Sequence, residues 1–277
     1  MRARVMPWLV LAIIALLCGC ASRHAASGLV LGVDRARQLV VVSHREIPGL
    51  MPAMTMPLCA RSLRDLDRLA PGDQIDFTLH LSKRASSIGS IRRRATLGEG
   101  LIDGLALQPP AAMIPLGQSM PDFALRDQEG EIQNSRDLRG LVVAVNFIYT
   151  RCPLPEVCPR LTSHFARLQR RFAGKAVRFL TVTMDPQYDT VAVLRDYAKK
   201  WRADRSSWQL LTGDKQTVDQ VAARFGMLYW PESGQLTHTS VTGVLDREGR
   251  LAARIEGSSY EAGQLGDLID GLLAGGS

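Results

Sequence analysis

The sequence is poor in three features, and each shortage narrows what the protein can be. None of its 5 cysteines is spaced as C-x-x-C, the spacing of a redox thioredoxin. Its net charge of +7 is scattered, with basic runs no longer than Arg92-Arg93-Arg94, which is typical of a solvated surface and disfavours nucleic acid as a partner. The N-terminal apolar run, 7–17, is too short to span a bilayer comfortably. What remains is 46% hydrophobic residues over 277 positions, enough for a core and for more than one domain.

Residues 1–20 have the pattern of an export signal. Two arginines precede the apolar run. The following Leu17-Cys18-Gly19-Cys20 resembles a bacterial lipobox, so we expect Cys20 to become the acylated first residue of the mature chain. The alternative is ordinary signal-peptidase cleavage near Ala21. Acylation would hold the protein on a membrane surface, on the periplasmic side in a bacterium.

Export changes what the other cysteines can do. Cys18 leaves with the signal peptide, and the mature domains keep Cys59, Cys152 and Cys158. In an oxidising compartment, Cys152 and Cys158 can pair or hold a metal, and Cys59 is left over.

The most informative stretch is 142–172. An apolar, β-branched run over 142–148 predicts a strand that is buried on both faces. Cys152 and Cys158 follow in a proline-rich loop, and an amphipathic helix is predicted over 161–172. Strand, dithiol loop and helix form the thioredoxin-type arrangement, in which the helix N-terminus favours thiolates. Thiolates exchange disulfides and bind soft metals.

The two cysteines have five residues between them, so their spacing leaves alternatives. They could form a plain stabilising disulfide, or be two buried thiols. Their position directly after a buried strand favours a functional site instead, because ligand sites of α/β folds gather there.

Three separated motifs resemble the Sco/SenC family of thioredoxin-fold copper chaperones for cytochrome c oxidase. They are 147–159, then 183–190 with Asp185 and Asp189, then 238–249, and the resemblance covers about 117–275. It implies copper ligation by Cys152, Cys158 and His238, a set that suits either oxidation state of copper. The family's loop is C-x-x-x-C-P, and this loop is two residues longer.

Some of these residues also have ordinary structural interpretations. A single histidine at a strand is often a surface residue, but the number of residues between His238 and Asp246 matches the spacing in the family. Asp185 and Asp189 could equally cap a helix and form a turn. His24, His80 and His164 are not expected to be ligands.

A smaller domain is predicted over 28–95, after a polar tether at 21–27. Strands are expected at 29–33, 38–43, 74–81 and 88–91, which together suggest a small all-β barrel of OB type. A linker over 96–116 then leads to an α/β thioredoxin-like domain at 117–277. That domain is expected to have a hairpin at 126–136, strands at 177–183, 208–212, 238–245 and 250–255, and helices at 191–201, 215–225 and 261–273.

The barrel sequence contains a cluster of soft donors. His44, Met51, Met54 and Met56 lie within thirteen residues, and Met54 and Met56 share one face of a strand. Thioethers with an imidazole suit Cu(I), although methionine is also common core filling. The segment resembles the CusF-like copper-binding domain, which implies ligation by His44, Met54 and Met56. Met51 stands where that family has a tryptophan and is a candidate third sulfur ligand.

Together these features predict a lipid-anchored periplasmic copper protein with two metal-handling domains. Its expected partners are copper and a copper-receiving protein such as an oxidase subunit. The main alternative is a thiol-disulfide oxidoreductase that reduces a partner's cysteines, with Cys152 and Cys158 as the redox pair. A binding protein for copper tolerance is a third interpretation. A cysteine peroxidase is disfavoured because Cys152 lacks the usual peroxidatic motif.

Overall fold

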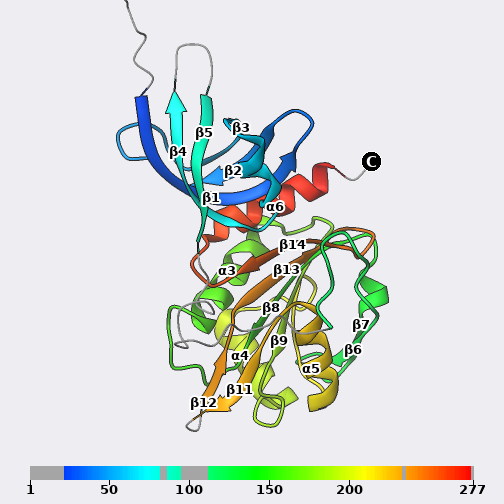
Figure 1. Ribbon diagram of the computed structural model, residues 1–277. Helices are drawn as coiled ribbons and strands as arrows, with labels where there is room; N and C mark the ends of the chain where they lie inside the picture. Colours follow the sequence, from blue (N-terminus) through cyan, green and yellow to red (C-terminus); the bar gives the residue numbers. More distant parts are fainter. Residues whose placement is uncertain (1–21, 82–85, 95–111, 233–234, 276–277) are drawn as a thin grey trace, which may run out of the picture.

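A computed structural model describes residues 22–81, 86–94, 112–232 and 235–275. A small β-barrel lies on one side of a larger α/β part, and the last helix runs between them (Figure 1). The predicted signal segment, with Cys20, lies outside the described residues. None of the described helices has the length and apolar character needed to cross a membrane.

The first part of the chain forms a closed five-stranded barrel in the order β1-β2-β3-β5-β4. Its elements are β1 (Ser22–Asp34), β2 (Leu39–His44), β3 (Met54–Ala60), α1 (Leu63–Asp67), β4 (Gln74–Leu81) and β5 (Ser86–Arg93). The barrel core is built from inward-facing aliphatic residues such as Val40, Val42 and Leu79. A short helix between β3 and β4 completes an OB-type arrangement, so the predicted all-β fold is confirmed.

The predicted tether at 21–27 is wrong for its described part. β1 begins at Ser22 and pairs with β4 from Ser22↔Leu81 to Leu29↔Gln74. Short polar residues looked like a linker, but an extended segment needs only a partner strand to become part of a sheet. Gly28 lets β1 cross closely over β2, because a Cβ there would lie 2.5 Å from Val42 Cγ1.

The larger part has the thioredoxin-like fold predicted from the sequence. Its sheet has the order β10-β9-β8-β13-β14. β8, β9 and β10 are parallel, and β13 runs antiparallel to both of its neighbours, β8 and β14. These strands are β8 (Val142–Ile148), β9 (Val177–Thr183), β10 (Trp208–Leu211), β13 (Val241–Leu245) and β14 (Leu251–Glu256). Every residue of β8 is buried, as expected for a central strand.

Helices cover both faces of this sheet (Figure 1). They are α3 (Cys158–Arg171), α4 (Val191–Trp201), α5 (Lys215–Arg224) and α6 (Ala262–Ala274). Asn146 of β8 donates to the carbonyl of Leu161 in α3, at 3.3 Å. Its neighbour Phe147 points to the opposite face and packs on Phe225 at the end of α5, with ring centroids 5.5 Å apart.

Two predicted boundaries are wrong in the larger part. A single strand was expected over 238–245, but the structure has two: β12 (Gln235–His238) pairs with β11 (Tyr229–Glu232), and β13 begins only at Val241. Thr239 N–H donates to the Leu228 carbonyl, and this turn takes His238 out of the main sheet. The end of the predicted linker is also packed, since Ile114 is buried and its N–H donates to the backbone carbonyl of Arg224. The prolines in this segment predicted a linker, but Ile114 packs into the core.

The predicted hairpin near 126–136 is present as β6 (Ala124–Arg126) and β7 (Ile132–Asn134), followed by the short helix η1 (Ser135–Leu138).

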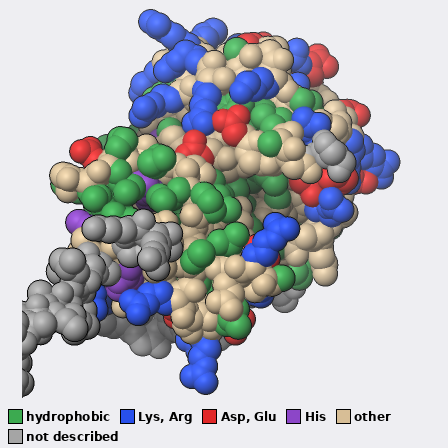
Figure 2. Space-filling view, turned by 90° about the horizontal axis from the view of Figure 1, so that it is seen from above, with side chains coloured by type: hydrophobic (Ala, Val, Ile, Leu, Met, Phe, Trp, Pro, Cys, Tyr) green, Lys and Arg blue, Asp and Glu red, His purple; other side chains and the backbone are tan. Residues whose placement is uncertain are grey.

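Viewed onto the barrel, Lys and Arg side chains lie around the periphery, and hydrophobic side chains occupy the centre of this face (Figure 2).

Candidate metal centres

The dithiol lies where β8 ends and α3 begins. Cys158 is the first residue of α3 and is buried, whereas Cys152 in the preceding loop is half-buried; both are free thiols. Four consecutive exposed residues, 153–156, form a turn between them. The two residues by which this loop exceeds the family pattern are therefore accommodated on the surface, and the cysteines remain close together.

His238 completes a compact group of three donors. Its Nε2 lies 4.0 Å from the Sγ of Cys158. The ligand atoms of Cys152, Cys158 and His238 all lie within 4.8 Å of one another. The β11–β12 hairpin brings His238 to the dithiol across a sequence separation of 80 residues from Cys158.

The tautomer of His238 is fixed by its neighbour. Nδ1 lies 2.7 Å from the carbonyl oxygen of Thr239. A carbonyl can only accept, so Nδ1 carries a proton. In the neutral ring Nε2 then has a free lone pair for a metal, and in the protonated ring Nε2 donates to a sulfur. A backbone carbonyl that orients a histidine in this way is a common feature of metal sites.

The two thiols have opposite electrostatic environments. The hydrogen bond from Cys158 lowers the pKa of Cys152 strongly, against the effect of burial, and His238 lowers it further. The same hydrogen bond and burial raise the pKa of Cys158. Cys152 is therefore the thiolate of the pair, and a metal must displace the proton of Cys158 to bind both sulfurs.

Asp189 ties the dithiol loop to the sheet. Its fully buried carboxylate accepts from the Thr150 N–H at 3.1 Å, from the Thr150 hydroxyl, and from the Thr183 hydroxyl at 2.5 Å. Burial raises the pKa of Asp189, although these hydrogen bonds act in the other direction. Thr190, not Asp189, caps α4, so Asp189 has an anchoring role that helix capping did not predict.

Further contacts hold both ends of the loop. Arg151 pairs with Asp185 at 2.5 Å and stacks 4.0 Å from the centroid of the Tyr188 ring. At the other end, the Ser258 hydroxyl donates to the Glu156 carbonyl at 2.8 Å.

Tyr149 is a site residue that the sequence analysis missed. Its buried ring meets the His238 ring edge-on, with centroids 5.8 Å apart and an angle of 89°. Burial and the nearby Cys152 charge raise the pKa of Tyr149 to about 12, so it stays a neutral hydroxyl. The only signal in the sequence was its place directly before the dithiol loop.

The barrel holds the second predicted donor set. His44 is 1% exposed, and its Nδ1 donates to the Arg45 carbonyl at 2.7 Å. Its Nε2 is buried and has no hydrogen-bond partner among the residues that the structure describes. Met54 is the cross-strand partner of His44, and Met56 is the partner of Val42. The side chains of these two cross-strand pairs therefore share the inner face of the barrel.

This arrangement fits a soft metal ion. An imidazole nitrogen that is buried and unpaired is costly unless something binds it. Met54 is 46% exposed at the rim, while Met51 and Met56 pack against the barrel core. The ligand roles of His44, Met51, Met54 and Met56 stay predictions.

His164, His80 and Cys59 have other surroundings. His164 is buried against Tyr260, and burial lowers its pKa to about 4. His80 faces Arg61, with Nδ1 at 3.2 Å from the guanidinium. Cys59 is exposed on β3.

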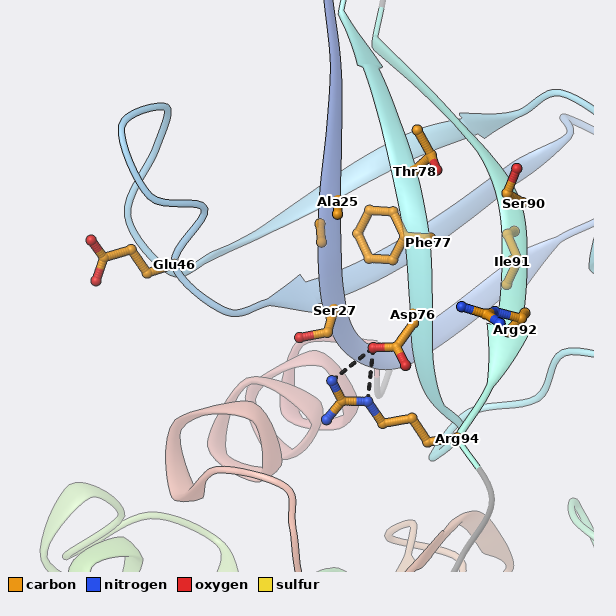
Figure 3. A pocket seen from close by; sticks show the side chains of 11 residues that line it. Ala25, Ser27, Glu46, Asp76, Phe77, Thr78, Ser90, Ile91, Arg92 and Arg94 are labelled. Carbon is orange, nitrogen blue, oxygen red and sulfur yellow. Dashed lines mark hydrogen bonds and ion pairs between the residues drawn. The ribbon is translucent and has the colours of Figure 1, made fainter.

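A cavity of about 670 Å³ is lined mainly by residues of β1, β4 and β5 of the barrel (Figure 3). Phe77, Ile91 and Arg92 line it, and Asp76 is paired there with Arg94 at 2.7 Å. None of the described residues that line it carries a sulfur or an imidazole, so it offers no soft metal site.

Comparison with known families gives two matches. Residues 112–272 match the SCO1/SenC family, and residues 23–93 match the copper-binding periplasmic protein CusF. The two matches correspond to the thioredoxin-like part and to the barrel.

Individual relatives agree with the first match. The chain is 31% identical over 138 residues to an SCO2-like protein of Rickettsia felis, which covers 47% of this chain and 65% of that protein. It is 29% identical over 143 residues to the SCO1 protein homolog of Bacillus subtilis, covering 50% and 73%. The chain thus spans just under two thirds of the length of the Rickettsia relative.

Solved structures agree on the fold. A SCO1/SenC family lipoprotein from Bacillus anthracis is similar with a TM-score of 0.51 and 27% identity, covering 57% of this chain and 97% of that one. BsSco, of the Sco family of cytochrome c oxidase assembly proteins, has a TM-score of 0.50 and 23% identity, covering 58% and 95%.

Proposed function

Because the chain belongs to the SCO1/SenC family and carries a CusF-like domain, we propose that it is a copper chaperone with two copper sites, one in each domain. Its recipient is a copper-binding protein, with a cytochrome c oxidase subunit as the first candidate, since BsSco belongs to a family of oxidase assembly proteins. The observation that carries the proposal is the convergence of Cys152, Cys158 and His238 within 4.8 Å.

The geometry of this group suits cargo that must leave again. Two sulfurs and one imidazole nitrogen hold copper in either oxidation state and leave room for a ligand from another protein. Cys152 is half-buried and Cys158 buried, so an incoming ligand reaches the Cys152 side first. A cleft of about 510 Å³, lined by Tyr149, Met184 and Leu236, opens beside the site. Both thiols must be reduced to bind copper, which couples loading to their redox state.

The low pKa of Cys152 favours a second candidate, a thiol-disulfide oxidoreductase. In that reaction the Cys152 thiolate attacks a partner's disulfide, and one partner sulfur leaves as a thiolate. Cys158, after losing its proton, then attacks the mixed disulfide and releases the partner's second thiolate. The partner gains two electrons, and Cys152 and Cys158 become a disulfide. A copper-tolerance role needs the same metal sites but no recipient.

Copper stoichiometry tests the two-site proposal. The reduced chain is expected to bind two copper ions. Met54→Leu with Met56→Leu keeps side-chain volume but removes both thioethers, and should remove one ion while the fold survives. Alkylating the thiols should remove the other. Metal analysis after gel filtration measures both losses; an unchanged copper content in the double methionine variant would remove the barrel from the account.

We also propose that Cys20 anchors the chain by its acyl groups to the periplasmic side of a bacterial membrane. The support is the sequence Leu17-Cys18-Gly19 before it. Mass spectrometry of the N-terminal peptide from membranes is expected to give an acylated Cys20, and Cys20→Ser should release the protein into the soluble fraction. An unmodified N-terminus at Ala21 or beyond would contradict the anchor.

A further inference from the structure

One carboxylate of the thioredoxin-like domain holds the two barrel strands that carry the predicted copper ligands. The Oδ2 atom of Asp267, in α6, accepts from the Ser43 hydroxyl at 2.7 Å and from the Thr55 hydroxyl at 2.8 Å. Ser43 and Thr55 are cross-strand partners on β2 and β3. A single oxygen atom therefore bridges the two strands from outside the barrel.

The bridged pair sits between the ligand positions. Along the β2–β3 ladder, His44↔Met54 precedes it and Val42↔Met56 follows it. Side chains alternate along a strand, so Ser43 and Thr55 face α6 while the donors face the barrel interior. Holding the pair from outside thus fixes the backbone of the neighbouring donors on the inside.

This end of β3 has little other support. Within the described residues, β5 pairs with β3 only at Cys59 and Ala60, so the segment Met54–Leu58 is bound on one side only, by β2. A shift of one residue between β2 and β3 would turn Met54 and Met56 to the outer face. The bridge by Asp267 opposes such a shift.

The carboxylate is itself held in place. Its Oδ1 accepts from Arg171 of α3 at 2.9 Å, and the nearby Gln264 side chain donates to the Ser43 carbonyl at 2.8 Å. Burial would raise the pKa of Asp267, but hydrogen bonds from Arg171, Ser43 and Thr55 outweigh it and lower the pKa. Asp267 is therefore a fixed, ionised acceptor.

We propose that Asp267 is a positioning residue for the copper site of the barrel, so that the thioredoxin-like domain sets the barrel's Cu(I) affinity through α6. This inference rests on the proposed function. Residues that orient metal ligands from behind typically contribute tenfold or more to metal affinity. By linkage, Cu(I) in the barrel strengthens its docking on α6 to the same degree.

The test measures Cu(I) affinity in the full chain with Cys152→Ser and Cys158→Ser, so that the barrel is the site observed. Cu(I) is competed against a chromophoric chelator. Asp267→Ala is expected to weaken binding by about tenfold. The matched control is Asp270→Ala, which removes another α6 carboxylate from Arg171, 2.7 Å away, and leaves the acceptor of the Ser43 and Thr55 hydroxyls in place. It should leave the affinity within about twofold.

A double-mutant cycle separates positioning from general destabilisation. Ser43→Ala with Thr55→Val should weaken Cu(I) binding as much as Asp267→Ala, and combining all three should add little. Asp267→Asn, which keeps an acceptor oxygen, should restore most of the affinity. At saturating Cu(I), the NMR chemical shifts of the Met54 and Met56 methyl groups should be the same in Asp267→Ala as in the parent chain.

Three results would overturn the inference. They are an unchanged affinity in Asp267→Ala, an equal loss in Asp270→Ala, and losses that simply add in the combined variant. A parent chain whose barrel binds no Cu(I) would overturn the proposed barrel function and this inference with it.

Discussion

His238→Ala is expected to abolish the thiolate-to-copper charge-transfer band of the reduced chain loaded with Cu(II). Two sulfurs alone leave Cu(II) short of its preferred coordination, and Nε2 is the only imidazole nitrogen placed beside the sulfurs among the described residues. The barrel donors contribute nothing to this band because they include no thiolate. Absorption spectroscopy of the full chain measures it directly.

The same variant separates the chaperone from the reductase. The rate of reaction of the dithiol with a small disulfide should stay within about tenfold of wild type, which is about 1.4 kcal/mol in the activation free energy. The reason is that the main cause of the low pKa of Cys152 is the hydrogen bond from Cys158. His80→Ala is the matched control, since His80 lies in the barrel against Arg61. Full copper binding in His238→Ala would show that the site is wrongly assigned.

Of the substitutions proposed for this chain, Asp189→Ala is expected to lower the free energy of unfolding most, by about 3 kcal/mol or more. It leaves the Thr150 N–H and two hydroxyls without their buried acceptor, and each such group costs about 1–3 kcal/mol. Because Thr150 precedes the dithiol, copper affinity should fall as well. Denaturant unfolding and copper titration measure the two effects.

Two further variants test the cause of this loss. Burial raises the pKa of Asp189, so the ionised form is disfavoured by the fold and Asp189→Asn should lose less stability than Asp189→Ala. Asp185→Ala breaks only the pair with the half-exposed Arg151 and should cost within about 1 kcal/mol. Equal losses in Asp185→Ala and Asp189→Ala would contradict the anchoring role.

Much of the fold could be predicted from local sequence. The buried run that became β8 and the alternating strand that became β4 are visible because periodicity reflects which side faces a core. The tether at 21–27 was mispredicted because pairing with β4 depends on residues fifty positions away, not on its own composition.

The residues of the Cys152–Cys158–His238 site could be predicted only where they belong to a sequence motif. Cys152, Cys158 and His238 came from motif spacing, and the structure places their donor atoms together. Tyr149 and the anchoring by Asp189 depend on packing between elements, which single-sequence patterns do not encode. The contact between Ser43 and Asp267 joins residues 224 positions apart, and no local signal marks it.

The most direct test of the account compares two properties of the reduced wild-type chain. The account predicts that Cu(II) added to it gives a thiolate-to-copper charge-transfer band that requires Cys152, Cys158 and His238 together. It also predicts slow turnover of protein disulfides. A chain that shows no such band, yet reduces protein disulfides rapidly, would contradict the chaperone and establish the oxidoreductase in its place.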